Sequence, residues 1–242
     1  GYTRRKLVTT EEHIAMDLYD VMRTTFACRE FTGEPVPAEV LHRIIEHARF
    51  APSGGNRQGW RIIEVTRDED KQALAELSLP AATRYLLEMQ AGESPLNAVI
   101  PSSVTDAEVA AAEAPHWLVA HIREAPTLLV VTVDLRLVAA MDKDLDRVGL
   151  IGGGSIYPLV WNILLAARNE GYAGTLTTWG AAAEPGVQAL LHIPQEWAVA
   201  AMIPLGRPVK QLTRLRRKPV EEIFFQDRWD GNPQRVDRSG SG

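Results

Sequence analysis

The chain has 242 residues, 45% of them hydrophobic and 24% charged, with a formal net charge of −5 at pH 7. This balance is that of a globular protein with enough chain for one large core, and its acidity argues against nucleic acid or an anionic membrane as a partner. Cys28 is the single cysteine, which excludes an intrachain disulfide and a zinc site made of several thiolates and fits a reducing, cytoplasmic setting.

The beginning of the chain predicts short helices followed by a strand. Apolar residues at helical spacing indicate a helix within 17–27 and another from Pro37 to about Phe50. The second helix should end there because Pro52 disfavours α conformation in the residue before it. The β-branched run 60–66 predicts a strand.

The rest of the chain alternates helical and strand-like segments. Residues 68–78 look helical, 79–125 are alanine-rich and mostly helical, and the apolar run 127–134 suits a strand buried on both faces. The remaining expected elements are an apolar helix with a glycine-rich start that ends at Gly171, a strand edge at 175–179, a short helix at 184–194 and a buried strand at 196–206. This interleaving places the protein in the α/β or α+β class.

Several common catalytic and metal motifs are missing from the sequence. There is no G-x-x-x-x-G-K-[ST] phosphate loop, and Tyr157 occupies the position of the last glycine in both a dinucleotide fingerprint and a G-x-S-x-G elbow. His42 and His47, like His116 and His121, are five residues apart, which directs them to different helix faces. We therefore predict no metal site and expect histidines that are exposed or hydrogen-bonded.

Three separated groups of polar residues are candidates for binding. They are Arg29-Glu30-Phe31, the turn Ala51–Trp60 with the sequence APSGGNRQGW, and a basic cluster made of Arg214, Arg216, Arg217 and Lys218. Each group alone is also consistent with an ordinary role: a surface ion pair, a plain turn and a solvated charged face.

Taken together, these groups resemble the nitroreductase family of FMN-dependent oxidoreductases over nearly the whole chain. The turn in ARFAPSGGNRQGW is similar to the family's flavin-binding turn. The other matches, in family order, are VMRTTFACREFTGEPVP, NILLAARNEGYAGTLTTW and IPLGRPVKQLTRLRRKPVEEI. The resemblance implies an α+β fold of the α/β three-layer kind, a mixed sheet flanked by helices, in an interwoven homodimer. It also implies a domain organisation: an N-terminal extension, one FMN-binding domain, a variable helical insertion within it and a flexible tail, at 1–15, 16–230, about 79–125 and 231–242.

The resemblance also implies which residues contact FMN. Arg29 matches a basic residue near the pyrimidine edge, where a cation favours the negative charge of reduced flavin. Arg217 is the expected phosphate ligand, with Arg214 and Arg216 as alternatives, because guanidinium groups bind phosphate in a forked geometry. The full expected set is Arg29, Pro52, Ser53, Gly54, Asn56, Gln58, Leu176, Thr177, Thr178, Trp179 and Arg217.

The first matching segment departs from the family pattern Arg-x-Ser-x-Arg-x-Phe. The positions before Arg29 read Thr25-Phe26-Ala27-Cys28, so a basic group on the phosphate side is missing unless Arg23 replaces it. Loss of one charge-assisted hydrogen bond costs on the order of 1.5–3 kcal/mol, which weakens phosphate binding without removing the rest of the site.

The implied reaction is hydride transfer from NADH or NADPH, through FMN, to nitroaromatics, quinones or similar electron-poor small molecules. It requires no catalytic side chain and no metal, because the cofactor carries the chemistry. Three alternatives remain open. They are a specialised reductase of the same fold with dehalogenase-like or enoyl-type activity, a non-catalytic flavin store or sensor, and an unliganded scaffold for protein interaction.

Overall fold

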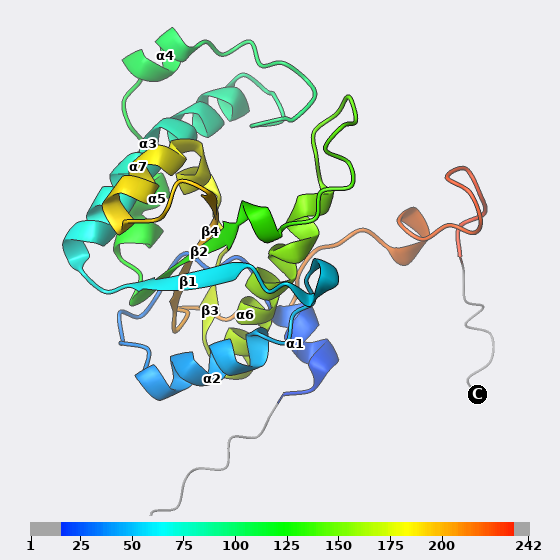
Figure 1. Cartoon of the computed structure of the whole chain (residues 1–242), viewed down its shortest axis with the longest axis horizontal. Coiled ribbons are helices and arrows are strands. Elements are labelled where there is room, and N and C mark those ends of the chain that lie inside the picture. The colour runs from blue at the N-terminus through cyan, green and yellow to red at the C-terminus, as the bar shows by residue number, and fades with distance from the viewer. Residues whose placement is uncertain (1–15, 235–242) are drawn as a thin grey trace, which may run out of the picture.

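The computed structural model describes residues 16–234 of the chain (Figure 1). The predicted N-terminal extension, 1–15, and residues 235–242 of the predicted tail lie outside the described residues. A four-stranded sheet forms the centre of the protein, in the order β1-β2-β4-β3, with every neighbouring pair antiparallel. The strands are β1 (Trp60–Val65), β2 (Thr127–Asp134), β3 (Ala173–Gly174) and β4 (Trp197–Gly206).

Helices cover both faces of this sheet, which gives three layers (Figure 1). Alternate residues of β2 point to opposite faces: Leu129 and Val131 join the core on one side, and Leu128 and Val130 join the core on the other. The first core includes α2 (Ala38–Ala48) and α6 (Tyr157–Asn169), and the second includes α3 (Asp68–Gln90), α5 (His116–Arg123) and α7 (Glu184–Leu191). The predicted α+β three-layer class is confirmed.

The strand pattern differs in detail from the predicted mixed sheet. Among the described residues, parallel pairing is confined to one isolated bridge, between Ala27 and Gly174. The predicted strand edge at 175–179 is not a regular strand. Regular pairing with β4 occurs just before it, at 173–174, and within it only an isolated bridge joins Thr177 to Met202. Glycine is required at position 174, because a Cβ there would lie 2.6 Å from the carbonyl oxygen of Pro204. Close backbone contact therefore fixes this strand against β4.

The predicted helices at 68–78 and at the start of 79–125 are one continuous helix, α3, which contains Pro80. Proline removes the hydrogen bond to the carbonyl four residues earlier, that of Glu76. Both Glu76 and Pro80 are exposed, so water can serve that carbonyl. Meanwhile Leu79 and Ala82 stay buried, and their packing holds the helix together across the proline.

The remaining described elements are short. They comprise α1 (Leu18–Thr24), α4 (Asp106–Ala111) and five 3-10 segments, among them one at Ile151–Ser155 that leads into α6. After Gln211, whose Nε2 donates to the carbonyl of Thr24, the C-terminal segment extends away from the body of the molecule as an arm (Figure 1). This arm folds back on itself where Gln234 N donates to the carbonyl of Phe224. No described helix is long and apolar enough to cross a membrane.

Candidate functional site

The turn at 51–60 is held in shape by its own polar groups. Gln58 N donates to Ser53 Oγ at 2.9 Å, and Gln58 Nε2 donates to Asn56 Oδ1 at 3.2 Å. Gly55, Asn56 and Gln58 have φ of 62°, 52° and 49°, a left-handed conformation that is uncommon outside glycine. Pro52, Asn56 and Gln58 are exposed. The predicted contact residues thus form a rigid, solvent-facing turn.

Two neighbours anchor this turn to the rest of the fold. Gly54 N donates to Ser155 Oγ at 3.1 Å, and Asp134 N donates to the Gly59 carbonyl at 2.8 Å. The backbone packs tightly at Gly59, where a Cβ would lie 2.8 Å from Leu137 Cβ. The turn therefore sits at the end of β2 that carries Asp134.

The segment with Arg29 lies at the other end of the sheet. Cys28 N donates to the Gly174 carbonyl at 2.9 Å, and the Glu30 carbonyl accepts from Val209 N at 3.1 Å. These bonds hold the exposed Arg29 beside the strand that leads to Leu176. Burial raises the pKa of the neighbouring Cys28 thiol, which keeps it protonated and unreactive.

The predicted flavin-side turn at 176–179 begins next to this segment. The backbone of Thr177 pairs in both directions with Met202, at 3.0 and 2.9 Å, while Thr178 is exposed. Leu176 packs against the core of α2 and α6, and Trp179 packs against the core on the opposite face. The structure thus brings the segment with Arg29 close to the start of residues 176–179, and their contact with flavin stays a prediction.

His121 is a residue that the sequence reasoning missed. It is 4% exposed and hydrogen-bonded to the backbone of Leu118, which agrees with the expectation of an exposed or hydrogen-bonded histidine, but its Nε2 atom has no hydrogen-bond partner among the described residues. Burial, together with the positive charge of Arg29, lowers the pKa of His121 to about 4. Its ring lies 6.0 Å from that of Trp179, which in turn lies 6.1 Å from that of Tyr85. The apolar periodicity of α5 could have indicated from the sequence that His121 is buried.

The three arginines of the basic cluster near the C-terminus, but not Lys218, line a pocket of about 620 Å³. Its walls include Arg23, the possible replacement for the missing phosphate-side cation, and the expected ligand Arg217. The other lining residues are Met22, Thr213, Arg214, Leu215 and Arg216. Four guanidinium groups around one cavity match the donors that a dianionic phosphate requires.

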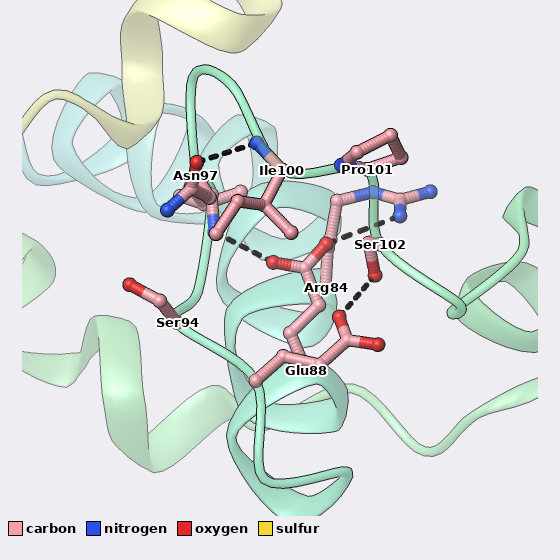
Figure 2. Close-up of a pocket in the computed structure, with 9 residues that line it drawn as sticks. Arg84, Glu88, Ser94, Asn97, Ile100, Pro101 and Ser102 are labelled. Atoms are coloured by element: carbon pink, nitrogen blue, oxygen red, sulfur yellow. Dashed lines mark hydrogen bonds and ion pairs between the residues drawn. The ribbon is translucent and has the colours of Figure 1, made fainter.

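The insertion at 79–125 contains another pocket, of about 680 Å³, shown in Figure 2. Most of its polar side chains already form hydrogen bonds or ion pairs within the chain. Buried Glu88 accepts from Leu96 N at 2.6 Å and pairs with Arg84 at 3.4 Å, and Asn97 Oδ1 accepts from Ile100 N at 2.7 Å. These groups hold the loop in place, so we assign no ligand to this pocket.

Two groups of residues expected to bind flavin, the segment with Arg29 and the turn 51–60, are well separated within one chain. The segment with Arg29 is at the Thr127 end of β2 and the turn at 51–60 is at the Asp134 end. Seven residue steps at about 3.3 Å each put these ends roughly 23 Å apart. One subunit therefore does not bring both groups to the same small ring. Among the described residues, no cluster of His, Cys, Asp or Glu is arranged to hold a metal ion.

Comparison with known proteins gives the same answer as the motifs. The pattern of the nitroreductase family matches residues 22–207. The chain is 27% identical to an iodotyrosine deiodinase of Nematostella vectensis, over 90% of this chain and 78% of that protein. It is 29% identical to an NADH dehydrogenase of Thermus thermophilus, over 81% of this chain and 89% of that protein.

A solved structure shows that the fold is shared as well. An oxidized iodotyrosine deiodinase bound to FMN and 3-iodo-L-tyrosine superposes with a TM-score of 0.60 at 21% identity, covering 84% of this chain and 96% of that one. The family pattern covers more than half of the sequence, and the three-layer fold agrees with it. This chain belongs to the nitroreductase family of flavin oxidoreductases.

Proposed function

We propose that this protein is an FMN-dependent reductase that uses NADH or NADPH to reduce an electron-poor small molecule such as a nitroaromatic or a quinone. One observation carries the proposal. The hydrogen bond from Cys28 N to Gly174 and the adjacent bridge hold Arg29 beside the start of the turn 176–179. The resemblance of the sequence to the family implies that Arg29 and the turn 176–179 contact the same flavin.

The residues divide the work of holding the cofactor. When bound, FMN would supply the redox chemistry, taking hydride from nicotinamide and passing it to the oxidant. Arg29 would place positive charge at the pyrimidine edge, where it would stabilise the negative charge of reduction. Arg217 and its neighbours would bind the phosphate. The exposed amides of Asn56 and Gln58 would donate to the ring and ribityl chain.

The separation of the two half-sites supports a homodimer in which the turn 51–60 comes from the second subunit. Large apolar side chains are exposed next to the turn, on α6 and on the extended arm: Phe50 at 72%, Trp161 at 44% and Trp229 at 98%. Exposed apolar surface of this kind is typical of protein interfaces. Light scattering should show a dimer when flavin is bound, and a flavin-loaded monomer would contradict the composite site.

A dehalogenase-like activity is the second candidate, and the comparisons favour it specifically. Proteins named iodotyrosine deiodinase are among the relatives, at 27% identity in one case, and the similar solved structure holds 3-iodo-L-tyrosine. In that reaction the aryl–iodine bond would take up two electrons and a proton, releasing iodide and leaving a C–H bond. The same reduced flavin would serve either reaction, so the residues that contact the substrate would determine which reaction occurs.

One spectroscopic experiment tests both candidates. The purified protein, reconstituted with FMN, should lose its yellow colour with NADH or NADPH under anaerobic conditions. Addition of a quinone should then restore the colour, whereas 3-iodo-L-tyrosine should do so with release of iodide if the second candidate is right. A colourless protein that takes up no FMN would reject both and favour the scaffold alternative. A yellow protein that neither donor bleaches would favour a store or sensor.

The role of Arg29 has its own test. Arg29→Ala, loaded with FMN, should be reduced more slowly by about 10-fold or more, since a charged hydrogen bond contributes roughly 1.5–3 kcal/mol. Arg29→Lys keeps the positive charge and should recover part of the rate. Equal rates in all three proteins would count against electrostatic stabilisation by this residue.

A further inference from the structure

Arg168 is a partly buried cation that lacks a carboxylate partner among the described residues. It lies in the last turn of α6, and its Nε donates to Thr24 Oγ1 at 2.9 Å. Burial lowers the pKa of Arg168, with no acidic group acting in the opposite direction. A guanidinium withdrawn from water is unfavourable unless an anion or a set of acceptors compensates it. Within residues 16–234 the two terminal nitrogens of Arg168 form no hydrogen bond, so they can bind an anion.

Thr24 connects Arg168 to the pocket lined by arginines. It directly follows Arg23, which lines that pocket, and its carbonyl accepts from Gln211 Nε2 at 3.0 Å. Gln211 precedes the pocket-lining residues Thr213 to Arg217 by two positions. Arg168 does not itself line the cavity with the four guanidinium groups, but it contacts Thr24, the residue next to the lining residue Arg23. Asp20, an acid close to this wall, pairs with Arg23 at 2.7 Å.

The same place in the fold is where the sequence lacks its expected phosphate-side groups. Thr25 is buried, and its hydroxyl is used within α1, where it donates to the Val21 carbonyl at 2.7 Å. Phe26 and Ala27 have no polar side-chain atoms. The segment 25–27 therefore provides no cation and no free hydroxyl, whereas Arg168 arrives at its edge from a helix more than a hundred residues later in the chain.

We propose that Arg168 is a phosphate-binding residue that replaces the missing basic group and, with Arg23 and Arg217, holds the phosphate of FMN. This inference rests on the proposed function. The bond from Nε to Thr24 would orient the guanidinium plane, and the terminal nitrogens would bind two phosphate oxygens as a fork. The isoalloxazine ring would be unaffected, because Arg168 acts on the phosphate alone.

Two ligands that differ only in the phosphate test this assignment. Apoprotein would be titrated with FMN and with riboflavin, and binding would be followed by quenching of flavin fluorescence. In the Arg168→Gln variant the affinity for FMN should fall by about 10- to 100-fold, the usual effect of losing a charged hydrogen bond, while riboflavin affinity stays the same. The dependence of FMN binding on salt should also become weaker in this variant.

Further variants separate binding from structure. Arg67→Gln is the matched control, because Arg67 is an exposed arginine paired with Asp70 at the start of α3, and it should bind both ligands as the wild type does. Arg168→Lys retains the charge without the fork and should bind FMN with intermediate affinity. Thr24→Val removes the acceptor that orients Arg168, so it should weaken FMN binding less than Arg168→Gln does.

The outcomes that would overturn the assignment differ from those that would overturn the function. If Arg168→Gln lowers the affinities for FMN and riboflavin equally, Arg168 is a structural residue. The same conclusion follows if neither Arg168→Gln nor Arg168→Lys folds. Unchanged FMN affinity, or a wild type that binds FMN and riboflavin equally well, would also overturn the assignment while leaving the flavin function intact. A wild type that binds neither ligand would overturn both.

Discussion

The turn 51–60 should depend on the absence of a side chain at Gly59. In Gly59→Ala the new Cβ would lie 2.8 Å from Leu137 Cβ and 3.4 Å from Leu137 Cδ1. Carbon atoms do not approach this closely without displacement, and the displaced atoms include the carbonyl that bonds to Asp134 N at the end of β2. The turn would therefore have to shift relative to the sheet.

The expected magnitude follows from the cost of overpacking. Forcing one extra methyl group into a close-packed site costs about 1–3 kcal/mol. For a chain of this size each kcal/mol lowers Tm by about 2–4 °C. Because the contact is made by Leu137 Cβ, a change of side-chain rotamer does not relieve it. The shifted turn should also bind FMN more weakly through Asn56 and Gln58.

Gly154→Ala provides the matched control. Gly154 lies in the 3-10 segment beside the turn, does not have a positive φ, and would place an added Cβ in open space, with no heavy atom within 4 Å. This variant should keep its Tm or gain slightly, since alanine restricts the unfolded chain. Both proteins would be unfolded thermally at one concentration and titrated with FMN. Equal stability of the two variants would refute the reasoning about Gly59.

Two further predictions concern pH and stability. Buried Asp142 accepts from Leu150 N at 2.7 Å and from Arg147 at 2.8 Å, and these bonds hold the pKa of Asp142 below its ordinary value. The Asp142→Asn variant should therefore be less stable than the wild type above about pH 4. The difference in denaturation midpoint should vanish as the pH falls through the lowered pKa. The pKa of His121 is lowered to about 4, so the unfolded state takes up a proton first and stability should fall between about pH 6.5 and pH 4. His121→Leu should flatten that part of the pH profile, and an unchanged slope would show that other groups cause it.

Local pattern was sufficient for much of the fold. The apolar run 127–134 became the fully buried strand β2, and the periodicity after Pro37 became α2, because a strand or helix that buries one face needs apolar residues at fixed intervals. The motifs alone also indicated the nitroreductase family, to which the chain belongs. Local rules were less reliable at Pro80, since whether a helix tolerates proline depends on which face is turned to solvent.

What the sequence by itself determined was the set of elements and the chemistry of the motifs, because both depend on neighbours along the chain. Only the tertiary structure decided which motifs meet. It separated Arg29 from the turn 51–60 by the length of a strand, and it brought Arg168 to Thr24 across 144 positions. Contacts of that kind arise from how helices and strands pack, and packing is not encoded in the spacing of any single segment.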